Sequence, residues 1–327
     1  MMKKVLIFGC GSIGQKHIAA LKRIKSVSLG ALRTKKGFYQ EIGLKDVKEF
    51  YSERAAFDWR PEYMIISNPT SLHLGCLLKG IKRGIKNIFI EKPLAGDYND
   101  VKKVSKQLKN YKGNIAIGFN LRFHPVFKKI KGLIGSKKYG RVLRASLEAG
   151  SYLPFWHPYE DYKKSYSALK RLGGGALRTL CHEIDLVQYL FGGFRYIYGD
   201  IGRISKLKID TDDNAFILID TDTNAKIDIK LDYLRPIPER KGEVLFENGL
   251  LRYSLNHPSI EYTGYNTRKW NKIFSCKAYN HDTQYQIQMK DFINQDYGTL
   301  CTLKEGINVM KAIHLAESSH KKRKYYV

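Results

Sequence analysis

Lys92 and His182 are the residues of this 327-residue chain best suited to proton chemistry. A lysine can hydrogen-bond a reacting oxygen, and burial can lower its pKa toward neutrality. A histidine titrates near neutral pH, and Asp185 lies one helical turn beyond His182. We predict that both act on one substrate oxygen, with Lys92 as the closer acid or base. The alternatives are a surface lysine and a buried structural histidine.

Three glycines near the start of the chain have the spacing of a dinucleotide-binding loop. They follow the apolar run Val5–Phe8 and precede a helical pattern that begins near Gln15. Gly9 allows a sharp turn, Gly11 lets a pyrophosphate approach the backbone, and Gly14 allows close packing of helix and strand. The predicted cofactor contacts in this loop are Gly9, Gly11, Ser12, Ile13 and Gly14. A glycine-rich turn without a ligand is the alternative.

The end of the second strand, Val27 to Leu32, carries the signal for the type of dinucleotide. NAD-binding domains place an acidic residue about 20 residues after the glycines, where it binds the ribose hydroxyls. Here the strand is followed by Arg33, Thr34 and Lys35 instead. These side chains suit a 2′-phosphate, so we predict a preference for NADP(H), with NAD(H) possible. Stacking of Arg33 on adenine is the alternative.

Strands and helices alternate up to about residue 120, which predicts a doubly wound parallel sheet, a Rossmann domain. Ligands bind at the carboxyl ends of the strands of such a sheet. The remaining predicted cofactor contacts lie at or near these ends: Ser67, Asn68, Pro69, His73, Glu91, Lys92 and Asn120.

The pattern changes beyond residue 120. Alternating segments at 142–148, 215–220, 225–231 and 243–247 predict a large, mostly antiparallel sheet. Gly173 to Gly175 introduce an amphipathic helix that extends to Leu190. We therefore predict two domains: an α/β domain over 1–120 and an α+β domain with an open-faced sheet over 121–327.

Four separated motifs give the chain a family resemblance. They are the glycine loop with His17, the Asn68-Pro69 loop ending at His73, the segment Glu91-Lys92-Pro93-Leu94, and the three glycines followed by His182 and Asp185. In this order they resemble the glucose-fructose oxidoreductase / inositol dehydrogenase / MocA family over essentially the whole length. The resemblance implies an NAD(P)-dependent oxidoreductase of a sugar or sugar derivative. It also implies a cis bond before Pro93 and a homodimer or homotetramer formed through the open sheet.

One departure from the family concerns the aspartate that precedes the histidine. Aligning on the glycines puts Thr179 at its position, and aligning on the histidine puts Arg178 there. The loss favours an alternative, a non-catalytic nucleotide- or sugar-sensing protein of the same fold. The aromatic segment 151–166 suits sugar rings and resembles the branch of the family found in surface-polysaccharide synthesis. The predicted substrate contacts are Lys92, Arg122, Tyr152, Trp156, Tyr166, Arg178, Thr179, His182 and Asp185.

Composition limits the remaining classes. The net charge is +26, but the basic residues are spread along the chain, so we expect no specific nucleic-acid binding. No apolar run approaches the roughly 20 residues of a membrane span, and no signal peptide precedes the first strand. The five cysteines are widely separated, which favours a reduced, cytoplasmic protein without a disulfide framework or a metal site.

Overall fold

The computed structural model describes residues 2–33, 44–156, 160–276 and 279–322, which divide into two compact units. Unit 1 contains Met1–Asn120 and Asn280–Ile307, and unit 2 contains Leu121–Tyr279 and Asn308–Val327. The second domain predicted from the sequence, 121–327, is therefore interrupted, because the segment 280–307 packs with the first unit.

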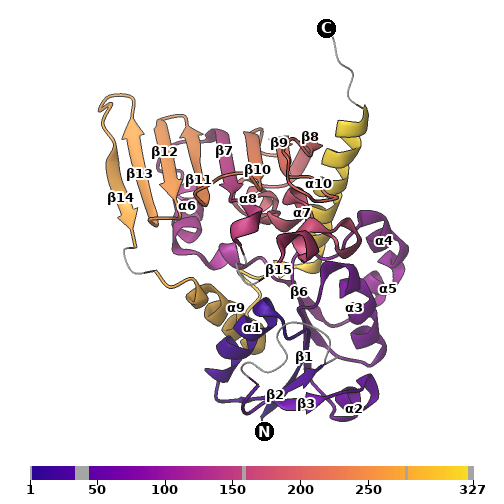
Figure 1. Ribbon diagram of the computed structural model, residues 1–327. Coiled ribbons are helices and arrows are strands. Elements are labelled where there is room, and N and C mark those ends of the chain that lie inside the picture. Colours follow the sequence, from indigo (N-terminus) through magenta and orange to yellow (C-terminus); the bar gives the residue numbers. More distant parts are fainter. Residues whose placement is uncertain (1, 34–43, 157–159, 277–278, 323–327) are drawn as a thin grey trace. The chain divides into compact units, whose positions relative to one another are not determined.

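Unit 1 is built on a mostly parallel sheet with the strand order β15-β6-β5-β4-β1-β2-β3 (Figure 1). Its strands β1, β4 and β5 carry runs of fully buried apolar residues, as expected for parallel strands that are covered on both faces. The bounds are β1 Lys3–Phe8, β2 Val27–Leu32, β3 Lys48–Phe50, β4 Tyr63–Ile66, β5 Asn87–Ile90, β6 Asn114–Ile117 and β15 Cys301–Thr302. Only β15 runs antiparallel to its neighbour among these described strands. The predicted Rossmann sheet is confirmed.

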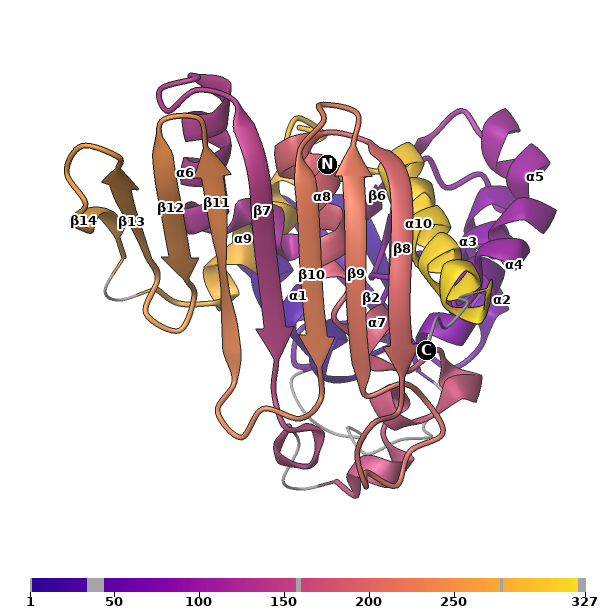
Figure 2. The same cartoon turned by 90° about the horizontal axis from the view of Figure 1, so that it is seen from above.

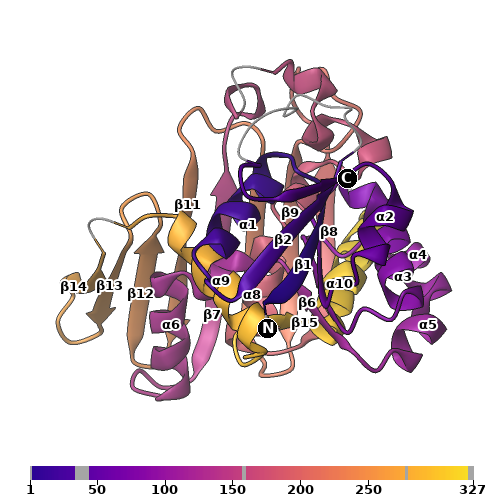
Figure 3. The ribbon, with the colours of Figure 1, turned by 90° about the horizontal axis from the view of Figure 1, so that it is seen from below.

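Six α-helices belong to the described part of unit 1. They are α1 Ser12–Lys22, α2 Glu53–Asp58, α3 His73–Lys82, α4 Tyr98–Lys103, α5 Ser105–Asn110 and α9 Asp282–Asn294. Helix α9, from the later segment, packs along α1 (Figure 3). Its Phe292 contacts the rings of Tyr63 and Phe89 in the sheet. A distant part of the sequence thus completes the hydrophobic core of the first unit.

Unit 2 contains an eight-stranded sheet in the order β14-β13-β12-β11-β7-β10-β9-β8 (Figure 2). Its strands β7 and β10 are parallel, and the other neighbouring pairs are antiparallel. The bounds are β7 Val142–Gly150, β8 Phe194–Gly202, β9 Asn214–Thr221, β10 Lys226–Asp232, β11 Glu239–Phe246, β12 Gly249–Ser254, β13 Ser259–Gly264 and β14 Asn271–Ser275. Buried and exposed residues alternate in β9 and β10, so one face of the sheet is packed and the other is open.

Helices cover one face of this second sheet. They are α6 Pro125–Gly135, α7 Ala176–Thr179, α8 His182–Phe191 and the later part of α10 Leu303–Lys322. The single helix predicted up to Leu190 is divided into α7 and α8 at Leu180 and Cys181. Short 3-10 helices lie before α7, at Leu153–Phe155, Tyr162–Lys164, Tyr166–Ala168 and Lys170–Leu172, and another at Asn120–Phe123. A further one, Thr70–Leu72, precedes α3 in unit 1.

Candidate cofactor and substrate sites

The glycine loop of unit 1 has the geometry that a pyrophosphate requires. Gly9 has φ +94°, and a Cβ there would lie 2.5 Å from the backbone nitrogen of Asn68. A Cβ on Gly14 would lie 2.1 Å from the carbonyl oxygen of Gly9, while a Cβ on Gly11 would meet nothing within 4 Å. The first and third glycines are therefore needed for packing, and the open space at the second lies at the start of α1. Ser12 and Ile13 form the first turn of α1, where free N–H groups favour phosphate. These residues fit a dinucleotide.

The loop after β4 ties the glycine loop to its neighbour. The Ser67 hydroxyl donates to the carbonyl oxygen of Gly9 at 2.8 Å. His73 is buried, and its two ring nitrogens lie 2.8 Å from the carbonyl oxygen of Pro93 and 2.9 Å from that of Asn68. Burial lowers the pKa of His73. Its hydrogen bonds give His73 a structural role at this edge of the sheet, joining the segments after β4 and β5, and the cofactor contact predicted for it stays a prediction.

Lys92 follows β5 and is half-buried, on a backbone held by its neighbours. The peptide bond between Lys92 and Pro93 is cis, as the family resemblance implies. The Glu91 carboxylate accepts the backbone N–H of Lys92 at 3.1 Å and contacts Nε2 of His17 at 2.8 Å. A Cβ on Gly118 would lie 2.7 Å from the same carboxylate, so the glycine makes room for it. Glu91 thus holds the Lys92 backbone from inside unit 1.

Arg33 forms an ion pair with an acid that was not among the predicted site residues. Its guanidinium lies 3.0 Å from the Glu49 carboxylate on the neighbouring strand β3. Thr34 and Lys35, the other residues predicted for a 2′-phosphate, lie outside the described residues. Asn120 is half-buried just after β6, at the carboxyl edge where it was predicted. The signal for Glu49 was present in the short strand 48–50, but nothing in the sequence gave its register against β2.

In unit 2, two predicted substrate contacts bind each other. Arg122 donates to the Asp185 carboxylate through Nε at 2.8 Å and Nη2 at 2.6 Å, and each side chain is 2% exposed. Gln188 also donates to this carboxylate at 3.2 Å. His182 begins α8 and is buried. The Arg122–Asp185 pair therefore fixes the start of unit 2 onto α8, the helix that carries His182.

The position of the missing family aspartate is occupied by groups that face protein partners. Arg178 forms an ion pair with Glu317 of α10 at 2.6 Å, and Thr179 is buried. A carboxylate does approach this helix from elsewhere in unit 2, since Asp212 accepts the backbone N–H of Leu177 at 2.8 Å. Burial raises the pKa of Asp212 to about 6. No carboxylate of α7 itself replaces the family aspartate.

The aromatic segment contributes its rings to local packing. Trp156 packs edge-on against Tyr233 at 5.2 Å between centroids, and Tyr152 packs against Phe155 at 5.0 Å. Tyr166 begins a 3-10 turn and is half-buried. A Cβ on Gly174 would lie 2.5 Å from the carbonyl oxygens of Tyr166 and Ser167, so the absence of a side chain at Gly174 allows this turn to pack closely against it. These described contacts lie within unit 2.

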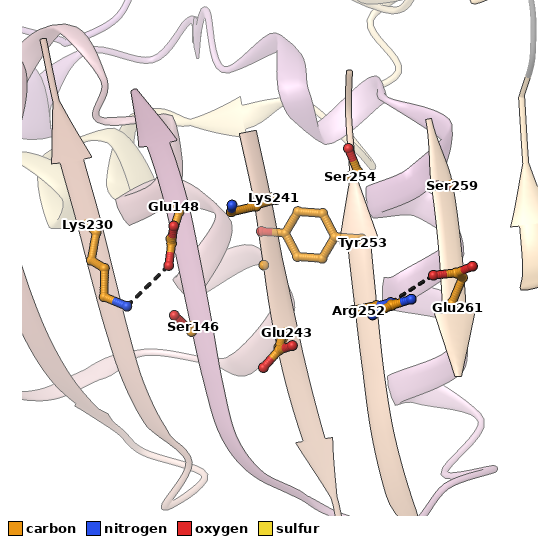
Figure 4. Close-up of a pocket in the computed structure, with 11 residues that line it drawn as sticks. Ser146, Glu148, Lys230, Lys241, Glu243, Arg252, Tyr253, Ser254, Ser259 and Glu261 are labelled. Atoms are coloured by element: carbon orange, nitrogen blue, oxygen red, sulfur yellow. Dashed lines mark hydrogen bonds and ion pairs between the residues drawn. The ribbon is translucent and has the colours of Figure 1, made fainter. Parts of the chain in front are cut away.

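The open face of the unit 2 sheet has a shallow hollow of about 510 Å³ (Figure 4). Its charged residues are balanced, with three acids and three bases, and neighbours pair across strands. The charged lining residues are Glu148, Glu243, Glu261, Lys230, Lys241 and Arg252. No residue predicted to bind cofactor or substrate lines this hollow.

The described residues contain neither a membrane-spanning helix nor a cluster of metal ligands. In the part of the chain that the structure describes, no helix is long and apolar enough to cross a membrane. Within the same ranges, no group of three or more His, Cys, Asp or Glu side chains is placed to hold a metal ion.

Comparisons with known protein families match both parts of the chain. Residues 3–119 match the model of an oxidoreductase family with an NAD-binding Rossmann fold, and residues 127–252 match the GFO/IDH/MocA C-terminal domain. The chain belongs to the GFO/IDH/MocA oxidoreductase family. The resemblance stated from the four motifs is thereby confirmed.

Curated relatives that are named for an enzymatic activity are similar to part of the chain. An inositol 2-dehydrogenase of Rhizobium meliloti is 26% identical over 57% of this chain and 54% of its own length. A glucose-6-phosphate 3-dehydrogenase of Bacillus subtilis is 24% identical over 67% of this chain and 62% of its own. The chain thus spans little more than half the length of these curated relatives.

Among solved structures, a levoglucosan dehydrogenase in complex with NADH superposes with a TM-score of 0.85 at 17% identity, and the match covers 98% of both chains. An oxidoreductase from Agrobacterium radiobacter in complex with NAD+, L-tartaric acid and magnesium gives a TM-score of 0.79 at 15% identity, over 98% of this chain and 97% of that one. At these identities the likeness establishes the fold.

Proposed function

We propose that the protein is a nicotinamide-dependent oxidoreductase that moves a hydride to or from an alcohol carbon of a sugar or sugar derivative. The observation that carries the proposal is the position of Lys92 at the carboxyl end of β5, in the sheet whose strand β1 leads into the glycine loop. Strand β4 lies between β1 and β5, and the contacts of Ser67 and His73 connect the three strand ends. The names of the curated relatives support sugar or polyol chemistry.

The roles of the residues follow from their chemistry. A bound nicotinamide dinucleotide supplies the hydride acceptor or donor. The Gly9–Gly14 loop and the first turn of α1 bind its pyrophosphate. When the alcohol is oxidised, the neutral Lys92 amine takes the hydroxyl proton at Nζ. When the carbonyl is reduced, the Lys92 ammonium gives that proton to the oxygen, and Glu91 fixes the Lys92 backbone throughout. His182, in unit 2, orients or relays that proton. Of the predicted substrate contacts, Tyr152, Trp156 and Tyr166 are the ones suited to a sugar face.

A second candidate function is a sensor of nucleotides or sugars without catalysis. It is favoured by one observation. Arg178 lies at the place of the family aspartate and forms an ion pair with Glu317, and the described helix α7 carries no carboxylate that could take the aspartate's role. A thermal-shift screen separates the two candidates when it is followed by an assay of hydride transfer. The screen uses NAD(H) and NADP(H), each with polyols, hexose phosphates and nucleotide sugars, because a ligand of the native state raises the melting temperature.

An absorbance change at 340 nm with a stabilising pair of ligands is the expected result. Ligand-induced stabilisation without any hydride transfer would favour the sensor. A chain that no dinucleotide stabilises would contradict both functions.

The finer inferences made from the sequence stay predictions. The preference for NADP(H) requires that Arg33 be available to a 2′-phosphate, and Glu49 competes for it. The sequence also favours a cytoplasmic location, a role in surface-polysaccharide synthesis and no specific binding of nucleic acid. The balanced charges on the open sheet face support a homodimer or homotetramer formed there, and light scattering on the purified protein measures its size.

A further inference from the structure

The ion pair between Arg33 and Glu49 is built into the sheet. Strands β2 and β3 run parallel with Ala31 opposite Glu49, and the backbone N–H of Arg33 donates to the carbonyl oxygen of Phe50 at 2.9 Å. This register holds Arg33, the first residue after β2, beside the carboxyl end of β3. The guanidinium then reaches Glu49 Oε1 at 3.0 Å. The contact is thus set by the backbone pairing of two strands.

A second donor holds the other oxygen of the same carboxylate. The Tyr51 hydroxyl donates to Glu49 Oε2, and this hydrogen bond raises the pKa of Tyr51. Glu49 is 27% exposed, against 10% for Arg33. The carboxylate is therefore the more accessible partner, and its orientation is fixed from both sides.

The pair lies next to the glycine loop. Cys10 lies between the first two glycines. Burial raises the pKa of its thiol, the charge of Arg33 lowers this pKa, and the charge of Glu49 raises it. All of these residues lie in unit 1, near the carboxyl ends of the adjacent strands β1, β2 and β3. In a Rossmann domain this edge receives the adenosine ribose, next to the pyrophosphate.

We propose that Glu49 is the ribose-binding acid of this site, supplied by β3 in place of the acid that other domains carry at the end of β2. A carboxylate accepts several hydrogen bonds, so Glu49 can hold Arg33 and a ribose hydroxyl together. The same charge repels a 2′-phosphate and neutralises the guanidinium that would bind it. Glu49 therefore selects NAD(H) over NADP(H), opposite to the preference predicted from Arg33 alone. This inference rests on the proposed function.

The test is a fluorescence titration of the intact protein with NADH and with NADPH, which requires no turnover. The parent should bind NADH at least about tenfold tighter, an effect of the size that one unfavourable charge contact produces. Glu49→Gln keeps the shape and removes the charge, so it should reduce the ratio of the two affinities by about tenfold or more. Glu53→Gln, an exposed acid four residues away that pairs with Lys79, is the matched control and should leave the ratio unchanged.

Two results would overturn the inference while leaving the proposed function in place. One is tighter binding of NADPH by the parent. The other is an unchanged ratio in Glu49→Gln, provided that the variant melts as the parent does. Arg33→Ala adds a further arm, since a guanidinium that held a 2′-phosphate would cost NADPH more than NADH when removed. If neither dinucleotide binds the parent, the inference and the proposed function fail together.

Discussion

The residues predicted from the sequence make different kinds of contact in the two units. In unit 1 the predicted residues follow successive strands of one parallel sheet, and at its carboxyl edge Ser67 contacts Gly9 and His73 contacts Pro93. In unit 2 three of the predicted substrate contacts form ion pairs within the protein, since Arg122 binds Asp185 and Arg178 binds Glu317. The packing of the glycine loop thus follows from the spacing of its glycines. A charged side chain carries no comparable signal, because it serves equally well as an internal partner or as a ligand contact.

The largest expected effect tests the internal role of the Arg122–Asp185 pair. Asp185→Asn would leave the Arg122 guanidinium buried without its counter-charge, and breaking a buried pair in this way costs about 3–5 kcal/mol. We expect a loss of that size in the free energy of unfolding, measured by urea denaturation. Glu261→Gln removes one acid from the more exposed pair with Arg252, and it should change stability little.

The opposite outcome would make unit 2 resemble unit 1. If Asp185→Asn kept the stability of the parent but abolished substrate-dependent stabilisation, Asp185 would be a ligand contact after all. The distinction between the two units would then disappear at this position.

The next effect concerns Lys92, whose substitution should lower turnover without lowering the stability of unit 1. Lys92→Met keeps the approximate length of the side chain and removes its charge and donors. Turnover should fall by about 10²-fold or more, as for a positioned acid or base. Affinity for NADH should stay nearly unchanged, because the glycine loop binds the pyrophosphate. Hydride transfer at 340 nm and an NADH titration measure the two quantities.

A matched control lies at the other end of the same strand. Lys86 precedes β5 and is exposed, so Lys86→Met should keep both turnover and affinity. Full activity in Lys92→Met would contradict the proposed site. A parallel loss of NADH affinity would instead show that Lys92 acts mainly through the cofactor.

The sequence predicted most of the fold, and the failures have a physical cause. Alternating strands and helices up to residue 120 gave the parallel sheet, and the spacing of Gly9, Gly11 and Gly14 gave the loop. The membership of α9 in unit 1 could not be predicted, because the pairing of Phe292 with Phe89 joins residues about 200 positions apart. Glu49 was missed for the same reason on a smaller scale: its contact with Arg33 depends on the register of β3 against β2.

The smallest expected effect concerns the stability of unit 1 and a buried amide side chain on α9. Gln288 is fully buried, and neither its amide oxygen nor its amide nitrogen has a hydrogen-bond partner among the described residues. On α9 it lies one turn from Tyr285, which contacts the His17 ring, and one turn from Phe292, which contacts Phe89, so it shares the buried face of the helix. A buried amide without a partner costs free energy that an apolar side chain of similar shape does not.

Gln288→Met should therefore raise the free energy of unfolding by about 1 kcal/mol, measured by urea denaturation. Gln286→Met is the control, because Gln286 is half-buried on another side of the same helix and should respond little. A loss of stability in Gln288→Met would mean that an enclosed water satisfies the amide, because removing the amide would then break real hydrogen bonds.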